Sequence, residues 1–432
     1  MMDKKSVYNP WTLEDEKEHP SSALEWWCVE AFFKSIENNE KWAFKADFTE
    51  WTVKPKVVGS NYKFTLLNQN NEKIYVCDTR DDTTRLKSSK NNLDVKFKES
   101  YFKGVFPDYE MYFKNQKHAI ELTLKYNAKS YPHWIAQDVT NGCLPAGLGF
   151  YKYGFIPKGD ISGTLRIKNK KFIITGEGYY EHVWGEFTYQ KLIGNIKGLT
   201  KSVSTYGKLI KHWIHNNEII IPKTIIFGTE NSPLGYDWAW ALLDNGWSVF
   251  FGNIMFWLME GPAAGVLILT KDGKTYEEWF NINFKYNQTQ KAKGYDFHYP
   301  TEIEINAIKG KETLHMNFKM TSKAREYVSK FAGGKYWIGI SICEAPGIIE
   351  GYFENEEKRT KLSGICKIEP QRQISISGHN TFKIDFLKPP NGFGLSLDFH
   401  SNLLKKKMSG KMHLLPKPKF CLNIKSLKST RK

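Results

Sequence analysis

The stretch from Gly176 to Phe187 combines residue types that can hold and move protons. It reads Gly-Glu-Gly-Tyr-Tyr-Glu-His-Val-Trp-Gly-Glu-Phe. Because side chains alternate between the two faces of a β-strand, we expect Tyr180, His182 and Trp184 on one face and Glu181 on the other. A phenol, an imidazole and an indole in one row indicate a polar, aromatic-lined cavity, whereas a strand that only packs a core would carry Val, Ile or Leu there.

Residues 24–34 and 41–48 are predicted to form a hairpin near the start of the chain. In the first strand, alternation puts Trp26, Cys28 and Glu30 on one face, so that Glu30 is a carboxyl group among apolar neighbours. Burial raises the pKa of a carboxyl group, which then keeps its proton near neutral pH. Glu30 is therefore a candidate catalytic acid, and the adjacent Trp27 is a candidate ligand contact.

The second half of the chain opens with another aromatic strand, residues 235–243. Asp237 is a second candidate acid there, and Trp238 and Trp240 are candidate ligand contacts. The Asn-Gly pair at 245–246 predicts a hairpin with a type I′ turn, which needs positive φ at both central residues.

These residues suit the hydration of a carbon–carbon double bond. An acid (Glu30, Asp237 or Glu181) would protonate carbon, and aromatic faces would stabilise the resulting cation by about 2 kcal/mol each when desolvated. His182 would position the water or accept its proton. This chemistry requires no metal ion and no organic cofactor. The predicted ligand contacts are Trp27, Tyr180, Trp184, Trp238 and Trp240.

Each candidate also has a purely structural interpretation. A buried tryptophan is usually part of the core, and Glu30 could simply pair with a lysine. His182 could hold a neighbouring strand, and Asp237 could serve the nearby turn.

The length of 432 residues and the 41% hydrophobic content indicate more than one folded domain. Short strand candidates separated by Asn, Gly, Asp and Lys run through the chain, which predicts an all-β fold. We expect a first barrel over residues 20–195, a linker that is in part helical over 196–232, a second barrel over 233–370 and a basic extension over 371–432. Residues 141–159, rich in Gly and Pro, are predicted to be a loop or an irregular edge.

The net charge of +16 concentrates at the end of the chain, where ten Lys and Arg residues follow Ser401 without an acidic residue. Neither an RNA-binding signature nor zinc-finger spacing accompanies it, so we expect no nucleic-acid partner. The six cysteines are scattered and no apolar leader follows the N-terminus, which favours a reducing, cytoplasmic location. Residues 200–215 predict a basic amphipathic helix that either rests on an anionic membrane surface or is an ordinary surface insertion.

Several segments together resemble one known family, the lipocalin-like family of AttH and carotenoid 1,2-hydratase (hydroxyneurosporene synthase). The segments are Glu25-Trp-Trp-Cys-Val-Glu30, Gly178-Tyr-Tyr-Glu-His-Val-Trp-Gly185, Tyr236-Asp-Trp-Ala-Trp240 and Gly347-Ile-Ile-Glu-Gly-Tyr352 with Leu362-Ser-Gly-Ile365. The resemblance covers roughly residues 20–370.

The resemblance implies two lipocalin-like antiparallel β-barrels packed together, with a cavity for a hydrophobic ligand. Some relatives hydrate isoprenoid double bonds and others catalyse cyclisations. His182 and Trp184 match the family's His and Trp positions, while Trp27 and Glu30 lie where the hydratases have an aromatic residue and an aspartate. Two classes remain open: an enzyme that hydrates or cyclises an isoprenoid-like molecule, and a non-catalytic protein that binds a hydrophobic ligand.

Overall fold

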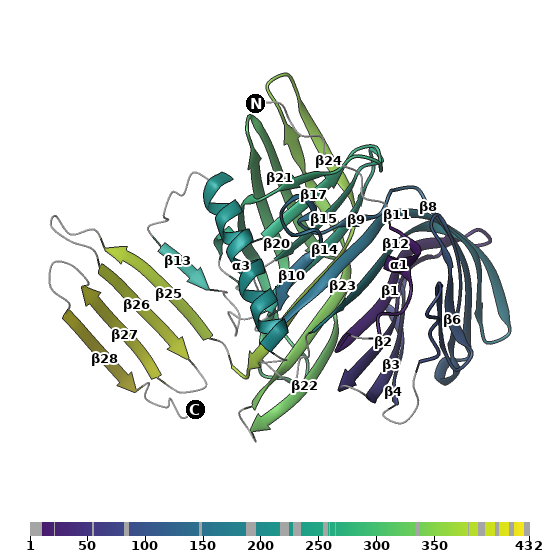
Figure 1. Cartoon of the computed structure of the whole chain (residues 1–432), viewed down its shortest axis with the longest axis horizontal. Helices are drawn as coiled ribbons and strands as arrows, with labels where there is room; N and C mark the ends of the chain where they lie inside the picture. The colour runs from purple at the N-terminus through teal and green to yellow at the C-terminus, as the bar shows by residue number, and fades with distance from the viewer. Residues whose placement is uncertain are drawn as a thin grey trace. The chain divides into compact units, whose positions relative to one another are not determined.

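The computed structural model is built almost entirely from antiparallel β-strands arranged in three sheets (Figure 1). It describes residues 11–20, 22–53, 56–81, 86–146, 149–186, 196–216, 224–227, 235–253, 258, 260–263, 265–333, 337–378, 380–387, 394–401, 406–413 and 419–426. The predicted all-β fold is confirmed.

The chain divides into two compact units. The first comprises Met1–Leu209, Gly246–Val249 and Ile268–Glu277, and the second comprises Ile210–Asn245, Phe250–Leu267 and Glu278–Lys432. The predicted linker over 196–232 contains the helix α3 (Ile196–Asn216), and β24 (Arg359–Ile376) runs through the predicted boundary at residue 370. The four-part division of the chain stays a prediction.

The first unit is organised by a twelve-stranded sheet in which strands that are neighbours in sequence mostly pair with each other. Its strands are β1 (Leu24–Ser35), β2 (Lys41–Val53), β3 (Lys56–Asn68), β4 (Lys73–Asp81), β5 (Leu93–Phe97), β6 (Ser100–Val105), β7 (Asp108–Asn115), β8 (Ile120–Ala128), β9 (His133–Trp134), β10 (Cys143–Ala146), β11 (Gly149–Ile167) and β12 (Lys170–Gly185). The central pairing for the candidate site is β12 with β1, which continues into β1 with β2.

Alternation of side chains gives this sheet two chemically different faces. On the inner face, Trp27 and Val29 of β1 pack with Phe44 and Phe48 of β2 in one hydrophobic core cluster. On the outer face, β2 carries Lys45, Asp47 and Thr49 in alternate positions, and Glu30 of β1 lies opposite Lys45. We use "inner face" and "outer face" in this sense below.

The second unit contains two further antiparallel sheets. The eleven-stranded sheet consists of β14 (Gly235–Leu243), β15 (Ser248–Asn253), β16 (Gly261–Ala263), β17 (Gly265–Thr270), β18 (Glu277–Trp279), β19 (Asn281–Lys291), β20 (His298–Lys309), β21 (Glu312–Met320), β22 (Arg325–Gly333), β23 (Trp337–Glu354) and β24, although parts of β15, β17 and β18 belong to the first unit. The five-stranded sheet consists of β13 (Thr224–Phe227), β25 (Asn380–Leu387), β26 (Gly394–Ser401), β27 (Lys406–His413) and β28 (Lys419–Ser426).

Helices are few among the described residues. The short ones are α1 (Leu13–Glu16), the 3₁₀ helix η1 (Gln116–His118) and α2 (Gln137–Thr140), while α3 runs over 21 residues. No helix in the described part of the chain is long and apolar enough to cross a membrane.

Two sequence-based expectations were wrong. Residues 149–159 are not a loop but the start of β11, because Tyr151, Tyr153 and Phe155 alternate in a strand that pairs with β12. The turn between β14 and β15 exists, but it is not of type I′, since φ is positive at Gly246 (87°) and not at Asn245.

The segment that precedes β1 packs onto the inner-face core of the first unit. Trp11 lies with its ring centroid 5.6 Å from that of Trp134 and 5.4 Å from that of Tyr180. Glu16 of α1 is buried, and its Oε1 accepts hydrogen bonds from Tyr109 Oη at 2.5 Å and from the backbone N–H of Phe106 at 3.1 Å. The segment thus brings the indole of Trp11 and the carboxyl group of Glu16 to the inner face.

Replacing Glu16 with Gln tests how this segment is held. Burial raises the pKa of Glu16, although the hydrogen bonds from Tyr109 and Phe106 oppose the shift. Because the folded-state pKa lies above the unfolded one, the proton stabilises the fold at low pH, and this contribution is lost as pH rises through the folded pKa. Glu16→Gln keeps an acceptor for both donors and removes the buried charge, so we expect a higher Tm at neutral pH and a weaker pH dependence.

Thermal unfolding followed by circular dichroism at several pH values would measure both effects. Glu14→Gln is the matched control, because Glu14 is an exposed residue of the same helix. A Glu16→Gln variant that is less stable than the wild type at neutral pH would contradict this account.

Candidate functional site

The candidate site lies on the inner face of the first unit, where β12 pairs with β1. The register aligns Trp27 with His182 and Val29 with Tyr180, so that Tyr180, His182 and Trp184 all face inward, as alternation predicts. The rings of Trp27 and His182 stack with centroids 4.9 Å apart, and those of His182 and Trp184 lie 4.7 Å apart. His182 is therefore enclosed by indoles and is 0% exposed.

Both ring nitrogens of His182 have a specific oxygen partner. Nδ1 lies 2.8 Å from the backbone carbonyl oxygen of Asp15, and Nε2 lies 2.9 Å from Oε1 of Glu25. A carbonyl oxygen only accepts hydrogen bonds, so Nδ1 carries a proton. If Nε2 had none, its lone pair would face a carboxylate oxygen at hydrogen-bond distance. The distance therefore fits the state in which a proton lies between Nε2 and Oε1.

Glu25 is held from several sides. Its Oε1 also lies 2.9 Å from Nδ1 of His19, and the backbone N–H of His19 donates to its carboxylate at 2.9 Å and 3.0 Å. The His19 ring stacks in turn on Trp184, with centroids 3.8 Å apart and planes 7° from parallel. The carboxylate is thus fixed opposite His182 by residues of the N-terminal segment.

The pKa values of Glu25 and His182 both lie below their usual values, but for different reasons. Burial raises the pKa of Glu25, but the hydrogen bonds and charges of His182 and His19 outweigh it, so that the pKa lies below the usual value. Burial lowers the pKa of His182, and the contact with Glu25 only partly opposes that shift. The imidazolium of His182 is consequently a stronger acid than that of an exposed histidine, and Glu25 remains ionised after the proton leaves.

The surroundings of this pair are aromatic and rich in unpaired donors. The indole N–H groups of Trp11, Trp27 and Trp134 and the hydroxyl of Tyr180 are buried and have no hydrogen-bond partner among the described residues. The ammonium group of Lys152 lies 3.7 Å from the ring centroid of Trp134. A buried unpaired donor is costly, so several of them around one histidine indicate a place for a molecule that offers acceptor oxygens.

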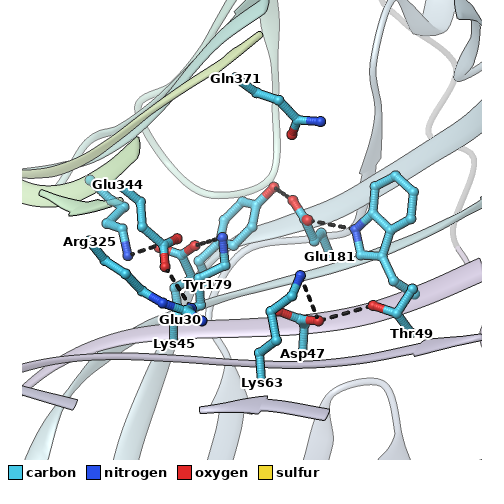
Figure 2. A network of polar contacts seen from close by, with 12 residues as sticks. Glu30, Lys45, Asp47, Thr49, Lys63, Tyr179, Glu181, Arg325, Glu344 and Gln371 are labelled. Carbon is cyan, nitrogen blue, oxygen red and sulfur yellow. Dashed lines mark hydrogen bonds and ion pairs between the residues drawn. The ribbon is translucent and has the colours of Figure 1, made fainter. Parts of the chain in front are cut away.

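Glu30 and Glu181, two of the predicted acids, lie on the outer face and not beside His182 (Figure 2). Oε1 of Glu30 forms an ion pair with Nζ of Lys45 on the adjacent strand at 3.3 Å. Asp47 similarly pairs with Lys63 at 3.7 Å and accepts from the hydroxyl of Thr49. The structure therefore separates Glu30 from Trp27 and His182 by the thickness of the sheet.

Glu181 is surrounded by three donors. Its Oε2 accepts from the hydroxyls of Tyr153 and Tyr179, the latter at 2.8 Å, and its Oε1 accepts from the indole N–H of Trp26 at 2.9 Å. Burial raises the pKa of Glu181, while these donors and Lys45 oppose the shift. A carboxyl group whose two oxygens both accept hydrogen bonds is better suited to orient the two tyrosines than to donate a proton.

The remaining predicted residues belong to the second unit. Asp237 is fully buried, with Oδ1 2.9 Å from Nη1 of Arg372 and Oδ2 accepting from the hydroxyl of Tyr286. Trp238 and Trp240 are also buried. The carboxylate of Asp237 is thus held in place by Arg372 and Tyr286.

His19, Glu25 and His182 are also the group of the first unit that could hold a metal ion, since one ligand atom from each lies within 4.8 Å of the others. Two nitrogen or oxygen ligands of a tetrahedral ion, each at about 2.1 Å from it, stand roughly 3.3 Å apart. Nδ1 of His19 and Nε2 of His182 each lie 2.9 Å from Oε1 of Glu25, which is closer than that separation. The three side chains are therefore spaced for hydrogen bonds with one another rather than for the ligands of one tetrahedral metal ion.

Sequence reasoning missed the partners that define the site. Glu25 could have been found, because strand alternation puts it on the same face as Trp27 and opposite to Glu30. His19 and the carbonyl of Asp15 carried no signal, since the contact between Asp15 and His182 joins residues 167 positions apart.

Comparisons with known proteins identify the fold. No family model and no curated protein matches the chain. Among solved structures, a protein assigned as AttH from Nitrosomonas europaea has a TM-score of 0.53 at 16% identity, with 88% of this chain and 98% of that chain covered. Kievitone hydratase from Nectria haematococca has a TM-score of 0.53 at 14% identity, with 85% and 93% covered.

A third solved structure, CghA with Sch210972, has a TM-score of 0.50 at 9% identity, with 85% of this chain and 94% of that chain covered. At these identities the similarity shows a common fold. The resemblance to the lipocalin-like AttH fold is therefore confirmed at the level of the fold over most of the chain.

A double-mutant cycle on Glu25 and His182 tests the shared proton. Glu25→Gln leaves His182 without its counter-charge, and His182→Gln leaves the buried carboxylate without its ring donor. Removing one partner of a buried charged pair costs about 3 to 5 kcal/mol. We expect each single variant to lose about this much unfolding free energy in urea and the double variant to lose clearly less than the sum. Additive losses would contradict direct coupling between the two side chains.

Proposed function

We propose that this protein is an enzyme that acts on a hydrophobic, isoprenoid-like small molecule by proton transfer, in a hydration or cyclisation reaction. One observation carries the proposal: Nε2 of His182 lies 2.9 Å from Oε1 of Glu25, while its Nδ1 lies 2.8 Å from the carbonyl oxygen of Asp15. An imidazole that is held in one tautomer beside a carboxylate can act as a general acid or a general base.

The surroundings of His182 supply the other requirements of such a reaction. The pair of His182 and Glu25 would deliver a proton to the substrate, and the carbonyl of Asp15 would hold the imidazole ring in place before and after the transfer. Trp27 and Trp184 would stabilise positive charge on the substrate through their ring faces, by about 2 kcal/mol each when desolvated. These roles use only groups of the protein, so we propose that the reaction is independent of a cofactor.

The structural comparisons support the reaction type. Kievitone hydratase, which shares the fold over 85% of this chain, is by its name a hydratase. The structure of CghA, which shares the fold over 85% of this chain, was determined with Sch210972.

The alternative function is non-catalytic binding of a hydrophobic ligand. The observation that favours it is the group of unpaired buried donors, the indole N–H groups of Trp11, Trp27 and Trp134 and the hydroxyl of Tyr180. Such donors would hold the oxygen atoms of a ligand whether or not it reacts. The two proposals differ in whether the proton of His182 is needed.

Incubation with farnesol in ¹⁸O-labelled water, followed by mass spectrometry, tests the enzymatic proposal. A product that carries the label indicates hydration, and an isomer of unchanged mass indicates cyclisation. His182→Gln has no titratable group that could release a proton, and we expect turnover to fall about 10²- to 10⁴-fold.

The matched control is His133→Gln, because His133 is also a buried histidine of the first unit, stacked on Tyr276 with ring centroids 4.2 Å apart. We expect that variant, and the wild type with an excess of chelator, to keep its turnover. Product formation that persists in His182→Gln would exclude His182 as the proton donor.

Farnesol binding, measured by quenching of tryptophan fluorescence, tests the binding proposal. An aromatic contact is worth about 0.5 to 1.5 kcal/mol, so Trp184→Ala should raise the dissociation constant by up to about tenfold. Trp247→Ala, which changes a tryptophan packed against Lys271, should leave the dissociation constant unchanged. Binding that is unchanged in Trp184→Ala would place the ligand elsewhere.

A further inference from the structure

One surface helix has a composition and exposure that the proposed reaction does not use. The helix α3 runs without interruption from Ile196 to Asn216 and contains no acidic residue (Figure 1). Its buried positions, Ser202, Thr205 and Leu209, recur every three to four residues and define the face that packs against the protein. Among the described residues, the exposed positions of the helix lie on the opposite side, and we call that side the available face.

The available face is apolar along one row. Val203, Ile210 and Ile214 are 61%, 41% and 51% exposed. Together with the exposed Gly207, they are spaced by four, three and four residues, which places them in a single line along a helix. Singly exposed apolar residues are common on protein surfaces, whereas a continuous row of them marks an interaction site.

Positive charge flanks this row on one side. Lys211 is exposed and lies next to the row by helical spacing, and the exposed Lys208 and His215 lie about one turn before and one turn after it. Lys201 is also exposed as a residue, but its ammonium group lies 4.0 Å from the ring centroid of Phe150. The available face is therefore half apolar and half cationic, with no carboxylate of the helix to neutralise it.

We propose that this face of α3 docks the protein on an anionic lipid surface. The row of Val203, Ile210 and Ile214 would enter the boundary between head groups and acyl chains, and Lys208 and Lys211 would meet the lipid phosphates. Helices that lie in a membrane interface combine an apolar face with lysines in this way. A lipid surface suits both halves of the face, because the apolar side chains would leave water and the lysines would stay beside negatively charged head groups.

Two lysines near an anionic surface contribute about 1 kcal/mol each. We therefore expect the double variant Lys208→Gln, Lys211→Gln to bind vesicles of phosphatidylcholine and phosphatidylserine about thirtyfold more weakly than the wild type. The variant Ile210→Ser, Ile214→Ser should weaken binding about tenfold through the loss of apolar contact. Binding to phosphatidylcholine alone should be much weaker for every variant.

Co-sedimentation of the full-length protein with these vesicles measures the effect. The matched control is Lys170→Gln, Lys171→Gln, which removes the same charge from two exposed lysines of the β12 hairpin. Ile173→Ser, at a 53% exposed residue of that hairpin, is the apolar control. We expect both controls to bind like the wild type, and raising the salt concentration to weaken binding because it screens the charges.

Three outcomes would overturn the proposal. The first is no sedimentation of the wild type with anionic vesicles. The second is an equal loss in the α3 variant and in the hairpin control, which would mean attraction by overall charge. The third is a concentration-dependent dimer that Ile210→Ser, Ile214→Ser dissociates in the absence of lipid, which would assign the face to a second copy of the chain.

Discussion

The hydrogen bond from His182 to the carbonyl oxygen of Asp15 is the contact on which the rest of the site depends. It determines which ring nitrogen carries a permanent proton and therefore which one exchanges its proton with Glu25. The carbonyl is positioned by α1, whose first turn is closed by the hydrogen bond from the backbone N–H of Thr12 to the carboxylate of Asp15. A few residues of the N-terminal segment thus set the chemistry of a histidine that lies far away in the sequence.

The second constraint is the register between β1 and β12. Because side chains alternate, each carboxyl group of β1 belongs to one face only, and a shift of one residue would exchange the two faces. The observed register puts Glu25 beside the indoles and His182 and puts Glu30 beside Lys45. The same strand therefore carries one carboxylate that can take part in proton transfer and another that is neutralised by a neighbouring lysine.

Much of this arrangement could be predicted from the sequence, because it follows from period-two alternation. The inward position of Tyr180, His182 and Trp184 and the all-β fold needed no other information. Alternation also distinguishes Glu25 from Glu30, because it places Glu25 on the same face as Trp27 and Glu30 on the opposite face. Contacts between distant segments, such as His19 with Glu25, depend on how the N-terminal segment folds back, which local patterns do not encode.

The pairing of β11 illustrates a second limit of local patterns. Glycines and a proline at its start indicate a loop, yet tertiary pairing with β12 draws the segment into the sheet. Gly159 permits this, since a Cβ atom there would lie 2.3 Å from the ring of Tyr126. Glycine in this strand therefore reflects close packing rather than chain reversal.

The measurement that tests the central claim most directly is nitrogen NMR of the His182 ring in protein labelled with ¹⁵N at histidine. The account predicts that Nδ1 is protonated at every pH at which the protein is folded, and that only Nε2 changes its protonation, with a pKa below the usual value for histidine. A neutral ring with the proton on Nε2 and a bare Nδ1 would contradict it, because the carbonyl of Asp15 would then have no donor and Nδ1, not Nε2, would be the nitrogen that exchanges a proton.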